Sequence, residues 1–170
     1  EASDIELCDE AIPFGRIKHA VFDADGTVST LRQGWEQVMA PVMIEAVLGE
    51  QYRTADVSLY EKVRRRVLEY IDQSTGIQTI LQMEALVEMV REFGLVPAHK
   101  VLDKFGYKDI YNRALMEVVN QRIARFERGQ LDVNDFTVKG AVDFLAALRN
   151  RGVTLYLASG TDREDVVRES

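Results

Sequence analysis

The stretch Ala20–Thr27 reads AVFDADGT: a short apolar run, two aspartates and a Gly-Thr turn. The apolar residues of segment Ile17–Phe22 predict a buried strand. Because side chains alternate along a strand, we expect Asp23 and Asp25 to share one face at its carboxyl end. Open α/β sheets bind their ligands at that end, so the stretch predicts a pair of functional carboxylates.

The turn after this strand is suited to hold the second aspartate in place. Gly26 permits a sharp exit from the strand, and we expect the Thr27 hydroxyl to hydrogen-bond back into the loop and restrain Asp25. The alternative interpretation is an acidic turn that only caps a strand. A chance match to Asp-x-Asp-Gly-Thr is rare in a chain of this length, which favours the functional interpretation.

Two carboxylates at this spacing can carry out phosphoryl chemistry. One carboxylate can attack a phosphorus atom and form an aspartyl-phosphate, while the other protonates the leaving oxygen and then activates a water molecule. Carboxylates are also the hard oxygen ligands that suit Mg²⁺, which usually keeps several waters and the substrate phosphate in its shell. The pair therefore predicts Mg²⁺-assisted chemistry on a phosphate ester.

A second strand-to-helix turn lies near the end of the chain. The segment Val153–Ala158 predicts another short strand, and Ser159–Asp162 reads SGTD. Thr161 and Glu164 fit a capping box at the start of a helix. A hydroxyl and free backbone N–H groups at such a turn form an anion site, although Ser-Gly after a strand is also ordinary turn chemistry.

The residues between the two turns predict a long helical insert. The two motifs are 159 − 23 = 136 positions apart, far more than one crossover helix requires. The segment Thr137–Gly152 predicts the helix that leads into the second strand. The insert is expected to contain helices at Gln33–Leu48, with a kink or restart at Pro41; after Ser58, with Glu61 completing a capping box; from Thr75, with Gln78, to before Gly94; after Pro97; and after Asp109, ending near Gly129.

These motifs resemble those of the haloacid dehalogenase-like (HAD) phosphohydrolase superfamily, over roughly positions 17–34 and 137–165. The resemblance implies an α/β fold with a Rossmann-like HAD core and an inserted α-helical cap, as in the phosphoglycolate-phosphatase-like branch. Residues 1–31 and 137–170 would form part of the core, and residues 32–136 would form the cap.

The resemblance also assigns roles to individual residues. Asp23 would be the nucleophile and Asp25 the general acid/base, and both would bind Mg²⁺, Asp25 through its backbone carbonyl. Ser159 would hydrogen-bond the phosphoryl group, with Gly160 and Thr27 completing the phosphate-binding loops. The expected activity is that of a phosphatase acting on a small phosphorylated metabolite. A phosphomutase, and a phosphate-binding protein without catalytic activity on the same scaffold, remain alternatives.

The cap is expected to select the substrate. Thr75, Gly76 and Gln78 combine a hydroxyl, a glycine and an amide at an expected helix start, where simple capping by Thr75 is the alternative. Arg32 lies on the expected flap or hinge, Val28–Gly34, and is a further candidate for substrate contact. The cationic run beginning at Lys62 and continuing through three arginines is interpreted as a solvated helix face. The two histidines show no metal-ligand spacing and are interpreted as structural.

Composition is consistent with a soluble enzyme. The net charge of −7 argues against binding to nucleic acid, because affinity for the phosphate backbone requires clustered positive charge. No apolar stretch approaches the ~18–20 residues of a membrane helix, so no membrane partner is expected. A single cysteine cannot form an internal disulfide, which favours a reducing compartment, the cytoplasm.

Two further motifs of the superfamily are not found in these 170 residues. They are a lysine that neutralises the phosphoryl charge and an acidic pair that completes the Mg²⁺ site, and both normally follow the second motif. We therefore expect the remainder of the same polypeptide to complete the core, and we expect residues 1–170 alone to be inactive. A receiver-like signalling domain would also phosphorylate an aspartate, but its short connections do not accommodate the long insert.

Overall fold

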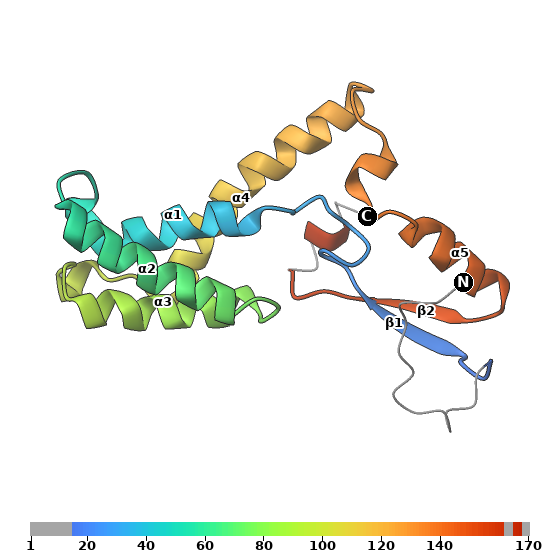
Figure 1. The fold of residues 1–170 in the computed structure, drawn as a ribbon, viewed down its shortest axis with the longest axis horizontal. Helices are drawn as coiled ribbons and strands as arrows, with labels where there is room; N and C mark the ends of the chain where they lie inside the picture. The colour runs from blue at the N-terminus through green and yellow to red at the C-terminus, as the bar shows by residue number, and fades with distance from the viewer. Residues whose placement is uncertain (1–14, 162–164, 168–170) are drawn as a thin grey trace.

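The computed structural model describes residues 15–161 and 165–167. Helices gather at one end of the molecule, and two strands with one further helix lie at the other end (Figure 1). The elements are, in chain order, β1 (His19–Asp23), α1 (Trp35–Leu48), η1 (Gly49–Arg53), α2 (Val57–Gln73), α3 (Thr79–Phe93), η2 (Ala98–Lys100), α4 (Lys104–Glu127), η3 (Val133–Phe136), α5 (Ala141–Asn150) and β2 (Thr154–Ala158).

The two strands pair in parallel, with Asp23 opposite Ala158. This pairing brings the carboxyl ends of the two predicted strands together, as the sequence motifs required. β1 begins two residues later than expected from the apolar run and includes Asp23 itself. Helix α5 packs on one face of this sheet, where the Phe22 and Phe144 rings meet edge to face with centroids 6.1 Å apart.

The other face of the sheet is open among the described residues. Val21 is 70% exposed, and its register partner Tyr156 is 48% exposed. Both side chains lie on the face opposite Phe22, because neighbouring residues of a strand point to opposite faces. A parallel sheet is normally covered on both faces, so this apolar surface is unusual for a folded domain.

The main hydrophobic core lies within helices α1 to α4. Buried residues recur at helical spacing, for example Val63, Val67 and Ile71 along α2, so each helix presents an apolar stripe to its neighbours. The largest side chains that are fully buried are Met39, Met43, Leu48, Met83, Leu86 and Met89. Each such burial contributes roughly 1.5–3 kcal/mol, so the helical part is stabilised by its own core.

Helix α1 runs continuously through Pro41, so of the predicted kink or restart the restart does not occur. The helix begins after Gly34, two residues later than expected, and ends where Gly49 adopts a positive φ of 54°. A Cβ at Gly49 would lie 2.8 Å from Cγ2 of Val96, so the loop after α3 packs directly on this glycine. Only a residue without a side chain fits there.

Two of the predicted helix starts are wrong because other residues cap the helices. The side chain of Asp56, not Ser58, accepts the hydrogen bond from the Leu59 N–H at the start of α2. Asp103 does the same for Gly106 at the start of α4, so this helix begins six residues before the position expected. Aspartate is among the strongest N-cap residues, and an earlier cap extends the helix.

The expected helix start at Thr75 is also wrong. The Thr75 hydroxyl donates to the Ile71 carbonyl at the end of α2, and α3 begins only at Thr79. After Pro97 there is a single 3-10 turn, η2, in place of a full helix. The ends of α3 before Gly94 and of α4 near position 129 agree with the prediction.

The chain passes between the strand pair and the helices through two segments that run side by side. The Thr30 N–H donates to the Phe136 carbonyl over 2.7 Å, and the Val138 N–H donates to the Val28 carbonyl over 3.0 Å. Ser29 and Thr137 form an antiparallel bridge between these bonds. The segment that leaves β1 and the segment that returns from α4 are therefore tied together.

Candidate active site

A tight loop follows β1 and positions Asp25. The Ala24 N–H donates to the Ala158 carbonyl over 3.0 Å, so the ladder of the sheet continues one residue beyond Asp23. The chain then turns at Gly26, with φ of 79°, and the Gly26 N–H donates to the Ser29 carbonyl. Ala24 is buried, whereas the two aspartates on either side of it are exposed. The loop thus presents both carboxylates at the carboxyl end of the sheet.

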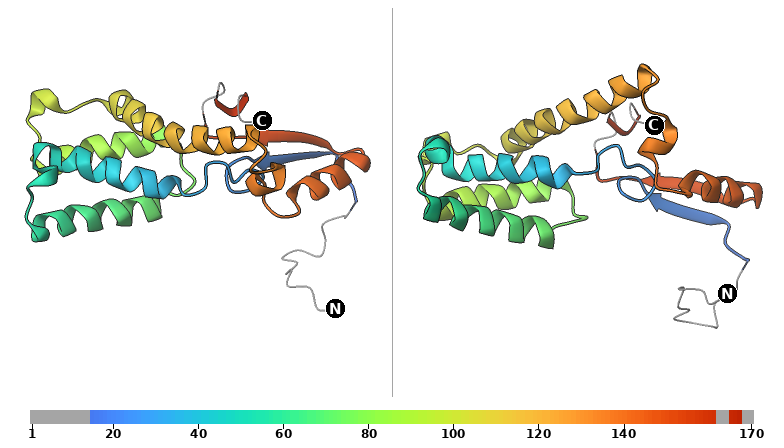
Figure 2. Two further views of the ribbon diagram at one scale, coloured as in Figure 1. Left: turned by 90° about the horizontal axis from the view of Figure 1, so that it is seen from above. Right: turned by 45° about the horizontal axis from the view of Figure 1, so that its top comes forward.

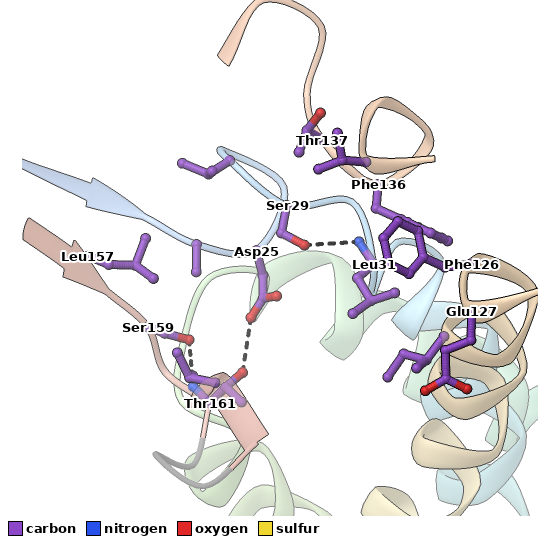
Figure 3. Close-up of a pocket in the computed structure, with 15 residues that line it drawn as sticks. Asp25, Ser29, Leu31, Phe126, Glu127, Phe136, Thr137, Leu157, Ser159 and Thr161 are labelled. Carbon is purple, nitrogen blue, oxygen red and sulfur yellow. Dashed lines mark hydrogen bonds between the residues drawn. The ribbon is translucent and has the colours of Figure 1, made fainter. Parts of the chain in front are cut away.

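The loop after β2 meets this carboxylate directly. The Thr161 hydroxyl donates to Oδ2 of Asp25 over 2.9 Å, and the Thr161 N–H donates to the Ser159 hydroxyl over 3.0 Å (Figure 3). Residues 136 positions apart thereby form one hydrogen-bonded cluster. The predicted adjacency of the two strand ends is observed. Thr161, which was expected to cap a helix, contacts Asp25. Its proposed capping partner, Glu164, lies outside the described residues.

The Thr27 hydroxyl contacts the first aspartate, not the second. It donates to Oδ2 of Asp23 over 3.4 Å, so the expectation that Thr27 restrains Asp25 is wrong. The reason is the direction of the loop, which turns back after Gly26 and places the threonine over the end of β1. Asp23 and Asp25 are thus each held by a different threonine.

A cavity of about 520 Å³ opens beside this cluster. Asp25, Ser29, Ser159 and Thr161 line one side, and apolar side chains from the end of α4 and from η3 line the other (Figure 3). The apolar wall includes Ile123, Phe126, Val133 and Phe136, and Glu127 lies beside it. Neither Asp23 nor Gly160 is among the described residues that line the cavity. The cavity is therefore on the Asp25 side of the aspartate pair.

The comparison with protein families agrees with this geometry. The family model for haloacid dehalogenase-like hydrolases matches residues 17–168, which include both strand ends and the helical insert. The chain belongs to the haloacid dehalogenase-like hydrolase family. No curated protein and no solved structure matches it. Membership identifies the chain as a hydrolase and agrees with the family resemblance of its two motifs.

Two arginines of the hydrolase hold the segment that leaves the site. Nη2 of Arg32 lies 3.3 Å from Oδ2 of Asp165, and the Arg32 side chain is only 10% exposed. Arg122 on α4 donates to the carbonyls of Leu31 and Gln33, the latter over 2.9 Å. Neither contact was predicted from the sequence, because each joins residues that are far apart in the chain. Arg32, a predicted substrate residue, is engaged here with protein groups.

The other predicted substrate residues lie away from the cavity. Thr75 and Gly76 form the loop between α2 and α3, and Gln78 precedes the first residue of α3. This loop is at the end of the helical part that faces the strands (Figure 2). None of the three lines the cavity among the described residues. On the surface of α2, Lys62 lies 5.6 Å from the centroid of the Phe93 ring and Nη1 of Arg64 lies 3.3 Å from Oε2 of Glu61.

The Tyr111 hydroxyl on α4 is influenced by charged groups of the site and of the segment that leaves it. Burial raises the pKa of its hydroxyl well above the usual range. The positive charge of Arg32 opposes this rise, and the negative charges of Glu36 and Asp25 add to it. These charges act on Tyr111 because α4 passes close to the loop after β1. The buried tyrosine therefore stays neutral while several charged groups surround it.

The chemistry of the donors at the strand end fits Mg²⁺. Asp23 offers a carboxylate oxygen and Asp25 a backbone carbonyl oxygen, and Mg²⁺ is commonly bound through one or two carboxylates with water and substrate phosphate completing its shell. The described residues contain no group of three or more His, Cys, Asp or Glu side chains that could hold a metal ion. His19 pairs with the Tyr156 hydroxyl, 3.1 Å from Nδ1, and His99 lies in η2. Oxygen donors are thus available at the site. They are fewer than a metal ion bound by protein ligands alone would need, so water and substrate would supply the rest.

Proposed function

We propose that this hydrolase is a Mg²⁺-dependent phosphatase that acts on small phosphorylated metabolites through an aspartyl-phosphate intermediate. The observation that carries the proposal is the hydrogen-bonded cluster of Asp25, Ser159 and Thr161 beside a cavity, at the carboxyl ends of two parallel strands. A ligand entering that cavity meets an acid/base group and two hydroxyls together. Convergent polar groups beside a cavity are the usual mark of a catalytic site.

The reaction follows from the positions of the two aspartates. A carboxylate oxygen of Asp23 attacks the phosphorus atom, the bond from phosphorus to the ester oxygen breaks, and Asp25 donates a proton to that oxygen as the alcohol leaves. Asp25 then takes a proton from a water molecule, which attacks phosphorus and releases inorganic phosphate and free Asp23. Each aspartate performs a task that its neighbour cannot perform at the same time.

The threonines keep these tasks separate. Thr161 holds Oδ2 of Asp25 from the side of β2, and Thr27 contacts Oδ2 of Asp23 from its own loop. The Ser159 hydroxyl accepts from the Thr161 N–H, and in our proposal it donates its own proton to a phosphoryl oxygen. When bound by Asp23 and Asp25, Mg²⁺ would neutralise phosphate charge and so permit the approach of the nucleophile.

We further propose the division into two domains that the family resemblance implies. Residues 1–31 and 137–170 would belong to the Rossmann-like core, and residues 32–136 to a cap that selects the substrate. The separate hydrophobic core of α1 to α4 and the paired crossing segments support this division. Within the described residues no helix is both long and apolar enough to cross a bilayer. The single cysteine favours the cytoplasm as the site of action.

The proposed chemistry is tested by replacing the aspartates in the full-length protein. Asp23→Asn should abolish Mg²⁺-dependent release of phosphate from monoesters, and Asp25→Asn should slow it by roughly 10²–10⁴-fold. Asp56→Asn is the matched control: it removes a carboxylate from the α2 cap, remote from the site, and asparagine caps equally well. Near-normal turnover in Asp23→Asn would exclude the covalent mechanism. Transfer of the phosphoryl group to a second sugar hydroxyl in place of water would identify a phosphomutase.

A further inference from the structure

The cavity beside Asp25 is mainly apolar. Nine of the fifteen described residues that line it carry aliphatic or phenyl side chains. Its volume of about 520 Å³ falls within the range of small-molecule sites, which is roughly 300–1,000 Å³. Phe126 is 47% exposed and Val133 is 55% exposed, so apolar surface at this wall remains available to a ligand.

We propose that this cavity binds the leaving group of the substrate, and that this leaving group is an apolar alcohol or phenol without a second anionic group. The inference rests on the proposed phosphatase function and adds the substrate class. It follows from where the cavity lies relative to the two aspartates, from the charges around it, and from the shape of its apolar wall.

The position of the cavity assigns it to the leaving group. A general acid must lie within hydrogen-bond reach of the oxygen that it protonates. Asp25, the proposed acid, lines the cavity, whereas Asp23, the proposed nucleophile, does not. Since the nucleophile attacks phosphorus from the side opposite the departing oxygen, the rest of the alcohol extends past Asp25 and Ser159 into the cavity.

The charges around the cavity disfavour a second anionic group. Among the described lining residues there is no lysine or arginine, and the charged ones are Asp25 and Glu127. Two cations of the neighbouring segments are engaged with protein groups, Arg32 with Asp165 and Arg122 with backbone carbonyls. A carboxylate or second phosphate on the leaving group would therefore meet like charge, with no cation among the described lining residues to offset it.

The apolar wall suits a flat or branched hydrocarbon group. The Phe126 and Phe136 rings meet edge to face, at 67° with centroids 6.1 Å apart, and close one side of the cavity. Such a pair leaves a ring face for a third aromatic group to stack on. A sugar in the same place would lose water from its hydroxyls without hydrogen-bond partners along this wall.

The experiment compares three monoesters with the full-length protein in Mg²⁺. The esters are 1-naphthyl phosphate, glucose 6-phosphate and 2-phosphoglycolate, with an apolar, a polyhydroxyl and a carboxylated leaving group respectively. We expect kcat/KM to be highest for 1-naphthyl phosphate, by about tenfold or more. Phe126→Gln should lower the preference for 1-naphthyl phosphate over glucose 6-phosphate, mainly through KM. Phe105→Gln, at the other end of α4 and 60% exposed, is the matched control and should leave the preference unchanged.

A charge variant tests the second half of the inference. Glu127→Gln should raise kcat/KM for 2-phosphoglycolate several-fold, whereas Glu117→Gln on the same helix should not. If turnover depends on Asp23 but favours glucose 6-phosphate or 2-phosphoglycolate, the leaving-group inference is wrong and the phosphatase function stands. If none of the esters is hydrolysed in an Asp23-dependent way, the proposed function fails and the inference fails with it.

Discussion

Replacing Thr161 with valine is the most direct test of the site geometry. Valine keeps the shape of the side chain but removes the hydroxyl that donates to Oδ2 of Asp25 over 2.9 Å. The backbone N–H of residue 161 still reaches the Ser159 hydroxyl, so the loop after β2 keeps its second contact. The variant therefore removes one hydrogen bond from the proposed acid/base and little else.

The size of the effect follows from the strength of that bond. A hydrogen bond to a charged group contributes roughly 1.5–3 kcal/mol, and the exposure of Asp25 to water favours the lower end. A loss of about 1.4 kcal/mol corresponds to roughly a tenfold fall in kcat/KM. Thr161→Ser keeps the hydroxyl and should retain activity within about threefold of wild type, the allowance for a looser side chain.

The assay is release of inorganic phosphate from a monoester by the full-length protein at saturating Mg²⁺. Thr27→Val serves as the comparison, because its hydroxyl contacts Asp23 at 3.4 Å, a longer and weaker interaction. We expect a smaller loss from Thr27→Val than from Thr161→Val. Wild-type kcat/KM in Thr161→Val would refute the idea that this threonine positions Asp25. Equal losses in the valine and serine variants would refute it as well.

Three further predictions concern stability and motion. Gly49→Ala should destabilise the fold by about 1 kcal/mol more than Gly129→Ala, measured by chemical denaturation, because both have positive φ but only position 49 lacks space for a Cβ. Arg122→Met should speed amide hydrogen exchange in segment 28–34, since two carbonyl acceptors there lose their donor. Burial raises the pKa of Tyr111 in the folded protein, so above the ordinary pKa of about 10 the unfolded chain loses this proton more readily than the folded one. The free energy of unfolding should therefore be constant with respect to this group below a pH of about 10 and fall above it. Tyr111→Phe should reduce that fall in denaturation curves.

Sequence patterns predicted the parts of the fold that depend on local periodicity. The two strands, the position of α5 between them in the chain and the helical character of the insert follow from apolar spacing and flanking glycines. The helix starts were less predictable. Ser58 and Thr75 have the right side chains for capping. Asp56 caps α2 in place of Ser58, and the Thr75 hydroxyl donates to the Ile71 carbonyl and so caps no helix.

The site was predictable only as far as strand ends determine it. Asp25 and Ser159 come together because their strands pair in parallel, which the motifs imply. The contact from Thr161 to Asp25 depends on how the loop after β2 folds over the loop after β1, and a single sequence gives no sign of this. The apolar wall beside Asp25 depends on the packing of η3 against the end of α4. The sequence patterns of these two elements do not indicate that they pack together.

The paired crossing segments have a consequence for the order of folding. His19 and Thr154 are register partners 154 − 19 = 135 positions apart, so pairing β1 with β2 in an unfolded chain requires closing a very long loop. Helices α1 to α4 bury their own core through contacts among themselves. Once they fold, the Thr30–Phe136 bond brings the two crossing segments together and shortens the effective loop to 30 − 19 = 11 positions on one side and 154 − 136 = 18 on the other. The helical insert thus acts as a folding scaffold for the strand pair, and we expect the strands to pair after the insert has folded.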